Sequence, residues 1–291
     1  MKPSSLYRAK FWTFGLWAAR HLSLSTATRL AKFFGKVYWK LAKHRREIVI
    51  ENILPCVAED RAVAEKLCQQ LFQNFVQKLF DLWRYEGGTA IDDLFCELTG
   101  WDIFLEAQRK NRGVLILTPH LGNWEFGAPV LAKKGQKLLV ITLEEPDGEL
   151  TQMRQAARAR WGIETLVIGN NPFAFVEIIR RLEAGASVAL LVDRPPASSA
   201  VSVNLFGKPF SASMAGAELA RASGCVLLPV YLPRLKTGYA GHILPEISYD
   251  RASLRSPKAR CELTQKIMDV FEKPIQEHLD QWYHFVPLWS K

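Results

Sequence analysis

Short apolar runs alternate with helical patterns over the carboxyl-terminal two thirds of the chain. Five mainly aliphatic runs predict buried strands at Val114–Leu117, Leu138–Thr142, Thr165–Ile168, Val188–Val192 and Val226–Tyr231. Apolar residues at three- and four-residue spacing predict helices near 122–134, 149–161, 172–184, 213–223 and 258–280, the last broken at Pro274. Strands alternating with helices predict an α/β fold whose mostly parallel sheet is flanked by helices.

The amino-terminal third is helical in pattern throughout. Residues 61–84 repeat bulky apolar side chains at helical spacing and predict a core helix that ends before Gly87-Gly88. Residues 11–30 have the length of a membrane span and are mainly apolar, but Arg20 and His21 lie mid-span. A helix that lies on one leaflet, or dips into it, is favoured over one that crosses the bilayer.

The next segment combines an apolar stripe with a basic one. The apolar stripe consists of Leu30, Phe33, Phe34, Val37 and Leu41. The basic stripe has the same period and consists of Arg29, Lys32, Lys36, Lys40 and Lys43. This pattern is typical of a helix at the surface of an anionic membrane. We therefore expect amphipathic membrane-associating helices over residues 1–50 and a single α/β domain over 51–291.

The net charge and the cysteine content indicate which binding partners and metal sites to expect. The 291 residues carry 38 Lys and Arg against 29 Asp and Glu, a net charge of +9, and the first 46 residues hold eleven bases and no acid. Such a surplus suits anionic membrane lipid, an acidic carrier protein or nucleic acid. The five cysteines are scattered without zinc spacing, which predicts reduced thiols and no metal site.

One segment carries candidate chemistry. In VLILTPHLGNWE (114–125), His120 directly follows a buried strand, where α/β sheets place their ligands. Gly122 and Asn123 let the chain turn into the next helix, which brings Glu125 back towards His120. A carboxylate on one imidazole nitrogen raises the basicity of the other, so this pair predicts a general base for a hydroxyl proton. A structural histidine is the alternative.

The ordered motifs resemble those of the bacterial lipid A biosynthesis acyltransferases, in the wider lysophospholipid acyltransferase-like superfamily. The similarity runs from about residue 10 to 286. It is carried by PHLGNWE (119–125), RREIVIENILP (45–55), GASVALLVDRPP (185–196), VNLFGKPFSASMAGAELARASGCVLLPVYLPR (203–234) and DQWYHF (280–285). The resemblance implies a glycerolipid acyltransferase-like fold and transfer of a fatty acyl chain from a carrier thioester to a hydroxyl of a lipid A precursor or related glycolipid.

The resemblance also implies roles for further residues. Arg158 is expected to meet the oxyanion or a phosphate, and Asp193 to hold an arginine or bind the acceptor. Asn123 and Arg234 complete the expected oxyanion and substrate contacts. The donor is acyl carrier protein or coenzyme A thioester, with no cofactor, because the thioester already carries the activation. Candidates for an apolar acyl slot are Trp101, Phe104, Trp124, Phe126 and Phe173.

The family places such enzymes at the cytoplasmic face of the bacterial inner membrane, held peripherally or by one amino-terminal anchor. Alternative acceptors are a lysophospholipid or an ornithine-type lipid, and the same dyad in a thioesterase would activate water. A non-catalytic membrane scaffold is a further alternative. Nucleic acid is not expected, because the amino-terminal bases alternate with bulky aliphatics and no nucleic-acid motif follows.

Overall fold

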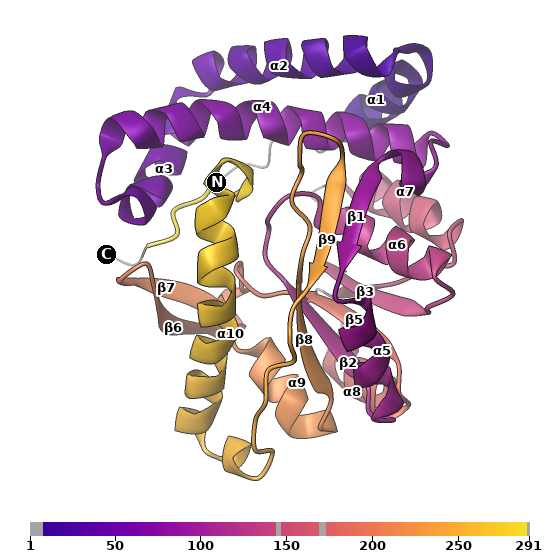
Figure 1. Ribbon diagram of the computed structural model, residues 1–291, viewed down its shortest axis with the longest axis vertical. Helices are drawn as coiled ribbons and strands as arrows, with labels where there is room; N and C mark the ends of the chain where they lie inside the picture. Colours follow the sequence, from indigo (N-terminus) through magenta and orange to yellow (C-terminus); the bar gives the residue numbers. More distant parts are fainter. Residues whose placement is uncertain (1–7, 144–146, 169–172, 290–291) are drawn as a thin grey trace.

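A seven-stranded, mostly parallel sheet forms the centre of the molecule (Figure 1). The computed structural model describes residues 8–143, 147–168 and 173–289. The strand order is β1-β9-β8-β2-β5-β3-β4. The strands are β1 (Phe95–Thr99), β2 (Val114–Thr118), β3 (Leu138–Leu143), β4 (Glu164–Ile168), β5 (Ser187–Leu191), β8 (Val226–Tyr231) and β9 (Tyr239–Ile243). The predicted fold class is confirmed, and all five predicted strands are present.

Alternate residues of the central strand β2 face opposite layers of helices. Ile116 packs with α5 (Trp101–Arg109) and α6 (Gly127–Lys133). Leu115 and Leu117 belong to the larger core on the other face. That core includes side chains of α8 (Ala174–Glu183), α9 (Ala215–Ser223) and α10 (Pro257–Glu277). Because both faces are covered, the strands are apolar throughout, which is why they were recognisable as continuous runs.

Several elements differ from the prediction. The edge pair β1–β9 and the hairpin of β6 (Ala200–Leu205) and β7 (Lys208–Ser213) have no continuous apolar run. Helix α10 continues through Pro274 instead of breaking there. The predicted helix near 122–134 begins as a short 3-10 turn over Trp124–Phe126. The first residue of the predicted helix 172–184 lies outside the described residues.

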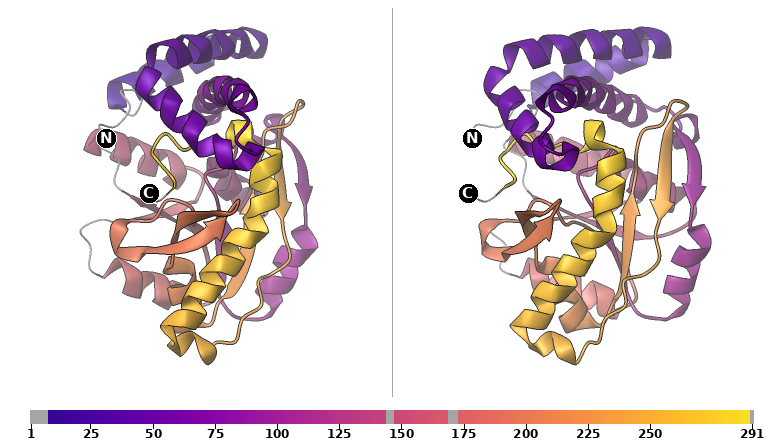
Figure 2. Two further views of the ribbon diagram at one scale, coloured as in Figure 1. Left: turned by 90° about the vertical axis from the view of Figure 1, so that its left-hand side faces the viewer. Right: turned by 60° about the vertical axis from the view of Figure 1, so that its left-hand side comes forward.

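Four amino-terminal helices form a layer over one end of the sheet, with α2 alongside α4 (Figures 1 and 2). They are α1 (Ala9–His21), α2 (Leu24–Leu41), α3 (Lys43–Ile53) and α4 (Arg61–Glu86). The single helix expected over 11–30 is therefore two helices, and the side chain of Ser23 caps the second by accepting a hydrogen bond from Thr26 N.

Small residues let α2 approach α4 closely. Ala27, Ala31 and Gly35 are its buried residues, and a Cβ on Gly35 would lie 2.5 Å from Gln73 Cα. The bulky aromatics Phe33 and Phe34 consequently point outward, 60% and 47% exposed. Among the helices of the described residues, none combines the length and the apolar character needed to cross a bilayer. The division at residue 50 stays a prediction.

Candidate active site

His120 lies in a tight turn at the carboxyl end of β2. Gly122, two residues further on, has φ +61, and a Cβ there would lie 1.9 Å from the carbonyl oxygen of Leu232. Only glycine accommodates both the left-handed backbone and this close approach. The turn therefore places the His120 side chain at the edge of the sheet, where it is 14% exposed.

The carboxylate that contacts the His120 imidazole is Asp193, directly after β5. Nδ1 of His120 lies 2.6 Å from Asp193 Oδ1, and the backbone N–H of His120 donates to Oδ2 at 2.9 Å. Because β2 and β5 pair in parallel, their carboxyl ends bring the two residues together. With Nδ1–H donated to the carboxylate, Nε2 is the nitrogen left to accept a proton.

The expected contact between Glu125 and His120 is thus replaced by the contact with Asp193. Glu125 lies in the 3-10 turn, and its carboxylate pairs with Arg154 at 2.6 Å and Arg158 at 2.8 Å, both from α7 (Gly148–Ala159). A buried carboxylate is stabilised more by two guanidinium groups than by a neutral imidazole. Burial alone would raise the pKa of Glu125, but these two arginines, helped by Lys78, lower it well below its usual range.

Asp193 accepts four hydrogen bonds while fully buried. Besides the two from His120, Oδ2 accepts from Trp282 Nε1 and from His284 Nε2, each at 2.9 Å. Burial would raise the pKa of this carboxyl, yet the two histidines and these donors hold it well below its usual range. The hydrogen-bond partners of Asp193 are thus imidazole and indole groups in place of the expected arginine, and a contact with the acceptor stays a prediction.

Asn123 and Arg234 occupy different surroundings. Asn123 is fully buried, and neither polar atom of its carboxamide has a hydrogen-bond partner in the described part of the chain. Arg234 is 30% exposed in its side chain and lies 3.7 Å from the buried carboxylate of Asp81 on α4. Its guanidinium borders a shallow depression that Asn74 and Lys236 also line.

An apolar cavity of about 110 Å³ begins beside the site. Trp124, Glu125 and Arg158 line its polar end. The Trp124 ring lies 4.9 Å from the His120 ring, centroid to centroid, and Lys78 Nζ lies 3.0 Å from the centroid of its indole. The cavity continues over the sheet face of Ile116, Val140 and Ala189 towards α5 and α6. Of the five aromatic candidates, Phe104 and Trp124 line it.

His120, Asp193 and His284 place their polar atoms within 4.8 Å of one another, a grouping that metals also use. Here His120 Nδ1 lies 2.6 Å and His284 Nε2 lies 2.9 Å from an oxygen of Asp193, which are ordinary hydrogen-bond distances. The three side chains thus form a hydrogen-bonded assembly around one carboxylate.

The fold and the site together define an α/β protein with a carboxylate-oriented imidazole whose ring neighbour, Trp124, lines an apolar cavity. Such a site can take a proton from a hydroxyl group while an aliphatic chain lies beside it. A family model described as bacterial lipid A biosynthesis acyltransferase matches residues 3–291. The chain belongs to this family.

Curated proteins of similar sequence are also named as acyltransferases. The phosphatidylinositol mannoside acyltransferase of Mycobacterium tuberculosis (strain ATCC 25618 / H37Rv) is 25% identical over 192 residues, covering 65% of this chain and 58% of that protein. The protein of the same name from Mycolicibacterium smegmatis is 24% identical over 190 residues, covering 65% of this chain and 60% of that protein. The chain thus spans 58% to 60% of the length of these relatives.

Sequence reasoning missed His284 and Arg154. His284 lies in the segment DQWYHF that carries the resemblance, but no spacing links it to Asp193, 91 residues away. Arg154 was given no role in the sequence analysis, which named only Arg158 on this helix. Its position one turn before Arg158 on the same helix was the signal that both meet one acid.

Proposed function

We propose that the protein is a membrane-associated O-acyltransferase that moves a fatty acyl chain from a carrier thioester to a hydroxyl of a glycolipid. The observation that carries this proposal is the His120–Asp193 pair, 2.6 Å apart, beside an apolar cavity. Membership of the acyltransferase family supports it. The thioester of acyl carrier protein or coenzyme A supplies the activation, so the proposal includes no cofactor.

The proposed reaction begins with proton transfer. Nε2 of His120 takes the proton of the acceptor hydroxyl, and the oxygen attacks the thioester carbonyl. Asp193 stabilises the resulting imidazolium through Nδ1–H. Collapse of the tetrahedral intermediate breaks the carbon–sulfur bond, and the imidazolium returns the proton to the leaving thiolate. The products are the lipid ester and the free carrier thiol.

Arginines are the proposed partners of the negative charges. Arg158 lines the polar end of the cavity while its Nη2 holds Glu125, so its remaining N–H groups suit an oxyanion or a substrate phosphate. Asn123 has an unpaired carboxamide beside the same turn and is proposed to gain a substrate oxygen as its partner. Arg234 with Lys236 suits a phosphate of the donor or the acceptor.

The cavity is the proposed site of the acyl chain, and Ala189 lies midway along its floor. The strand register aligns Ala189 with Ile116 on one side and Val140 on the other. Ala189→Phe should displace about two methylenes of a long chain, each worth about 0.8 kcal/mol, and so lower kcat/KM for long-chain donors about tenfold or more. Turnover of a short-chain donor should be unchanged and is the internal control. Equal losses with both donors would place the chain elsewhere.

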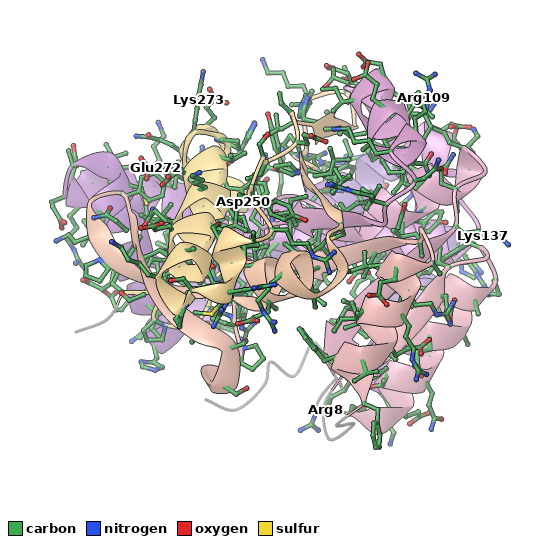
Figure 3. The ribbon with its side chains drawn as sticks, turned by 90° about the horizontal axis from the view of Figure 1, so that it is seen from below. Arg8, Arg109, Lys137, Asp250, Glu272 and Lys273 are labelled. Atoms are coloured by element: carbon green, nitrogen blue, oxygen red, sulfur yellow. The ribbon has the colours of Figure 1, made fainter. Side chains whose placement is uncertain are left out.

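The outer faces of α1 and α2 are the proposed membrane-binding surface. Their exposed bulky side chains are Phe14, Trp17, Leu24, Phe33, Phe34 and Leu41. Lys32, Lys36 and Lys40 are exposed on the same helix as the two phenylalanines. The opposite end of the molecule instead carries exposed charges of both signs, such as Asp250 (Figure 3) and the adjacent Arg251. An apolar surface with a one-sided basic rim fits an anionic bilayer.

Replacing Trp17, Phe33 and Phe34 together with serine should weaken binding to anionic vesicles at least about tenfold, because the inserted apolar area is lost. Vesicle sedimentation measures the change. Val63→Ser is the matched control, since Val63 is 42% exposed on α4 outside this surface. Unchanged sedimentation of the triple variant would refute the membrane surface.

The acceptor is proposed to be a sugar hydroxyl of a lipid A precursor or a related glycolipid. The related proteins are named for phosphatidylinositol mannoside, which is also a glycolipid. The test is mass spectrometry of a bacterial membrane lipid extract incubated with the protein and a mixture of acyl thioesters. A glycolipid heavier by one acyl group is expected. Release of free fatty acid at the same rate with and without acceptor would indicate a thioesterase instead.

A further inference from the structure

The carboxyl-terminal segment lies directly against the catalytic turn. Gly122 N donates to Gln281 O at 3.0 Å, and Tyr283 N donates to His120 O at 2.9 Å. Residues 281–284 are thereby paired with the backbone that carries His120. From this position Trp282 and His284 reach Asp193 and supply two of its four hydrogen bonds.

The side chain of Asn52 on α3 makes hydrogen bonds to the same segment from the other side. Its Nδ2 donates to the carbonyl oxygens of His284 at 3.1 Å and Val286 at 2.8 Å. Its Oδ1 accepts from Leu288 N at 3.0 Å. The carboxamide is buried and uses both of its polar atoms on the segment, so it holds the backbone of His284 in one place.

The surroundings of His284 define its protonation. The side chain is 1% exposed, and burial lowers the pKa of His284. The charged or titratable groups that act on it are Asp193, His120 and Arg194. Because Nε2 lies 2.9 Å from a carboxylate oxygen, Nε2 carries the proton, while Nδ1 is buried without a hydrogen-bond partner in the described residues. His284 is therefore a neutral, fixed donor.

We propose that His284 is a positioning residue that acts on the reaction through Asp193. This inference rests on the proposed function of the His120–Asp193 pair. The Nε2–H bond of His284 holds the carboxylate in the plane in which it meets His120, and it also draws charge away from that carboxylate. Asp193 thus orients His120 and remains a weak base, so the proton taken from the acceptor stays on His120.

Loss of this donor has two expected effects. His284→Phe keeps a ring of similar volume but removes the hydrogen bond, and kcat should fall about tenfold to a hundredfold while KM for the donor is unchanged. The acid limb of the kcat pH profile should also move to higher pH, because a less well solvated carboxylate holds the imidazolium proton more strongly. His284→Gln places an amide N–H near the former Nε2 and should restore the rate and the profile.

Two tryptophan variants separate positioning from packing. Trp282→Phe removes the other donor from the same segment and should shift the pH profile in the same direction. Trp289→Phe is its matched control, because Trp289 Nε1 donates to backbone carbonyls of Glu51 and Asn52 and not to Asp193. A rate loss without a shift in the profile for His284→Phe, or equal effects of the two tryptophan variants, would overturn the proposal.

A spectroscopic measurement tests the same inference without turnover. In 15N spectra of histidine-labelled protein, the imidazole signal lost on His284→Gln should have the Nε2–H tautomer, and burial should make it titrate at lower pH than an exposed histidine. The Nδ1–H tautomer, or a titration at higher pH than that of an exposed histidine, would contradict the assignment of His284 as a neutral donor. Failure of the proposed acyl transfer would appear separately, as activity that survives His120→Ala while this spectrum is as expected.

Discussion

Asp193→Asn is expected to lower kcat for acyl transfer by about 10⁴-fold while leaving the fold intact. The introduced carboxamide would fit the same volume, and its oxygen can still accept from Trp282 and His284. Its NH₂ group would face His120 Nδ1, which would then have to act as an acceptor. The imidazole proton would move to Nε2, and the base could no longer take the acceptor proton.

Steady-state kinetics of purified Asp193→Asn, compared with Asp60→Asn, measures this effect. Asp60 caps α4 through Val63 N, and asparagine caps helices equally well, so that variant controls for the general effect of the exchange. Circular dichroism checks the fold of both. Turnover of Asp193→Asn within about tenfold of the wild type would show that Asp193 is not the partner of the base.

Glu125→Gln is expected to act mainly on stability. It leaves the guanidinium groups of Arg154 and Arg158 buried without the carboxylate that now pairs with both. Breaking a buried ion pair in this way costs about 3–5 kcal/mol. Chemical denaturation measures the free energy of unfolding. Glu164→Gln is the matched control, because the Glu164–Arg181 pair is exposed and should contribute about 1 kcal/mol or less.

The pH dependence of this stability has a definite sign. The pKa of Glu125 is lowered in the folded protein, so its ion pairs contribute fully above the pKa of the unfolded chain, about 4.3. Their contribution declines as the pH falls below that value towards the folded pKa. The stability difference between wild type and Glu125→Gln should therefore shrink in acid. A difference that grows in acid would contradict the ion-pair assignment.

The central sheet was predictable because burial on both faces makes its strands continuous apolar runs. The edge strand β1 has the sequence FCELT and is largely exposed, so no run marks it. The His120 turn was also readable, since a strand followed by Pro119, His120 and Gly122 has few alternatives. The amphipathic helix α2 was predictable from its apolar and basic stripes, although the break before it depended on the capping hydroxyl of Ser23.

The partner of His120 was not predictable from spacing. Glu125 is near in sequence, but the 3-10 turn directs it to α7, and the pairing of β2 with β5 brings Asp193 from 73 residues away. Local spacing reports which side chains share a helix face, whereas contacts across a sheet depend on strand order. Asp193 itself was predicted as a site residue, but its hydrogen bonds with His120, Trp282 and His284 could not be predicted from their spacing in the sequence.

The most direct test of the account is acyl transfer by His120→Ala in the mass-spectrometric assay with thioester donor and glycolipid acceptor. Loss of the acylated glycolipid, with normal product from the exposed control His44→Ala, is the predicted result. The variant protein should keep the wild-type circular dichroism spectrum. Acylated glycolipid formed at the wild-type rate by His120→Ala would contradict the assignment of His120 as the base.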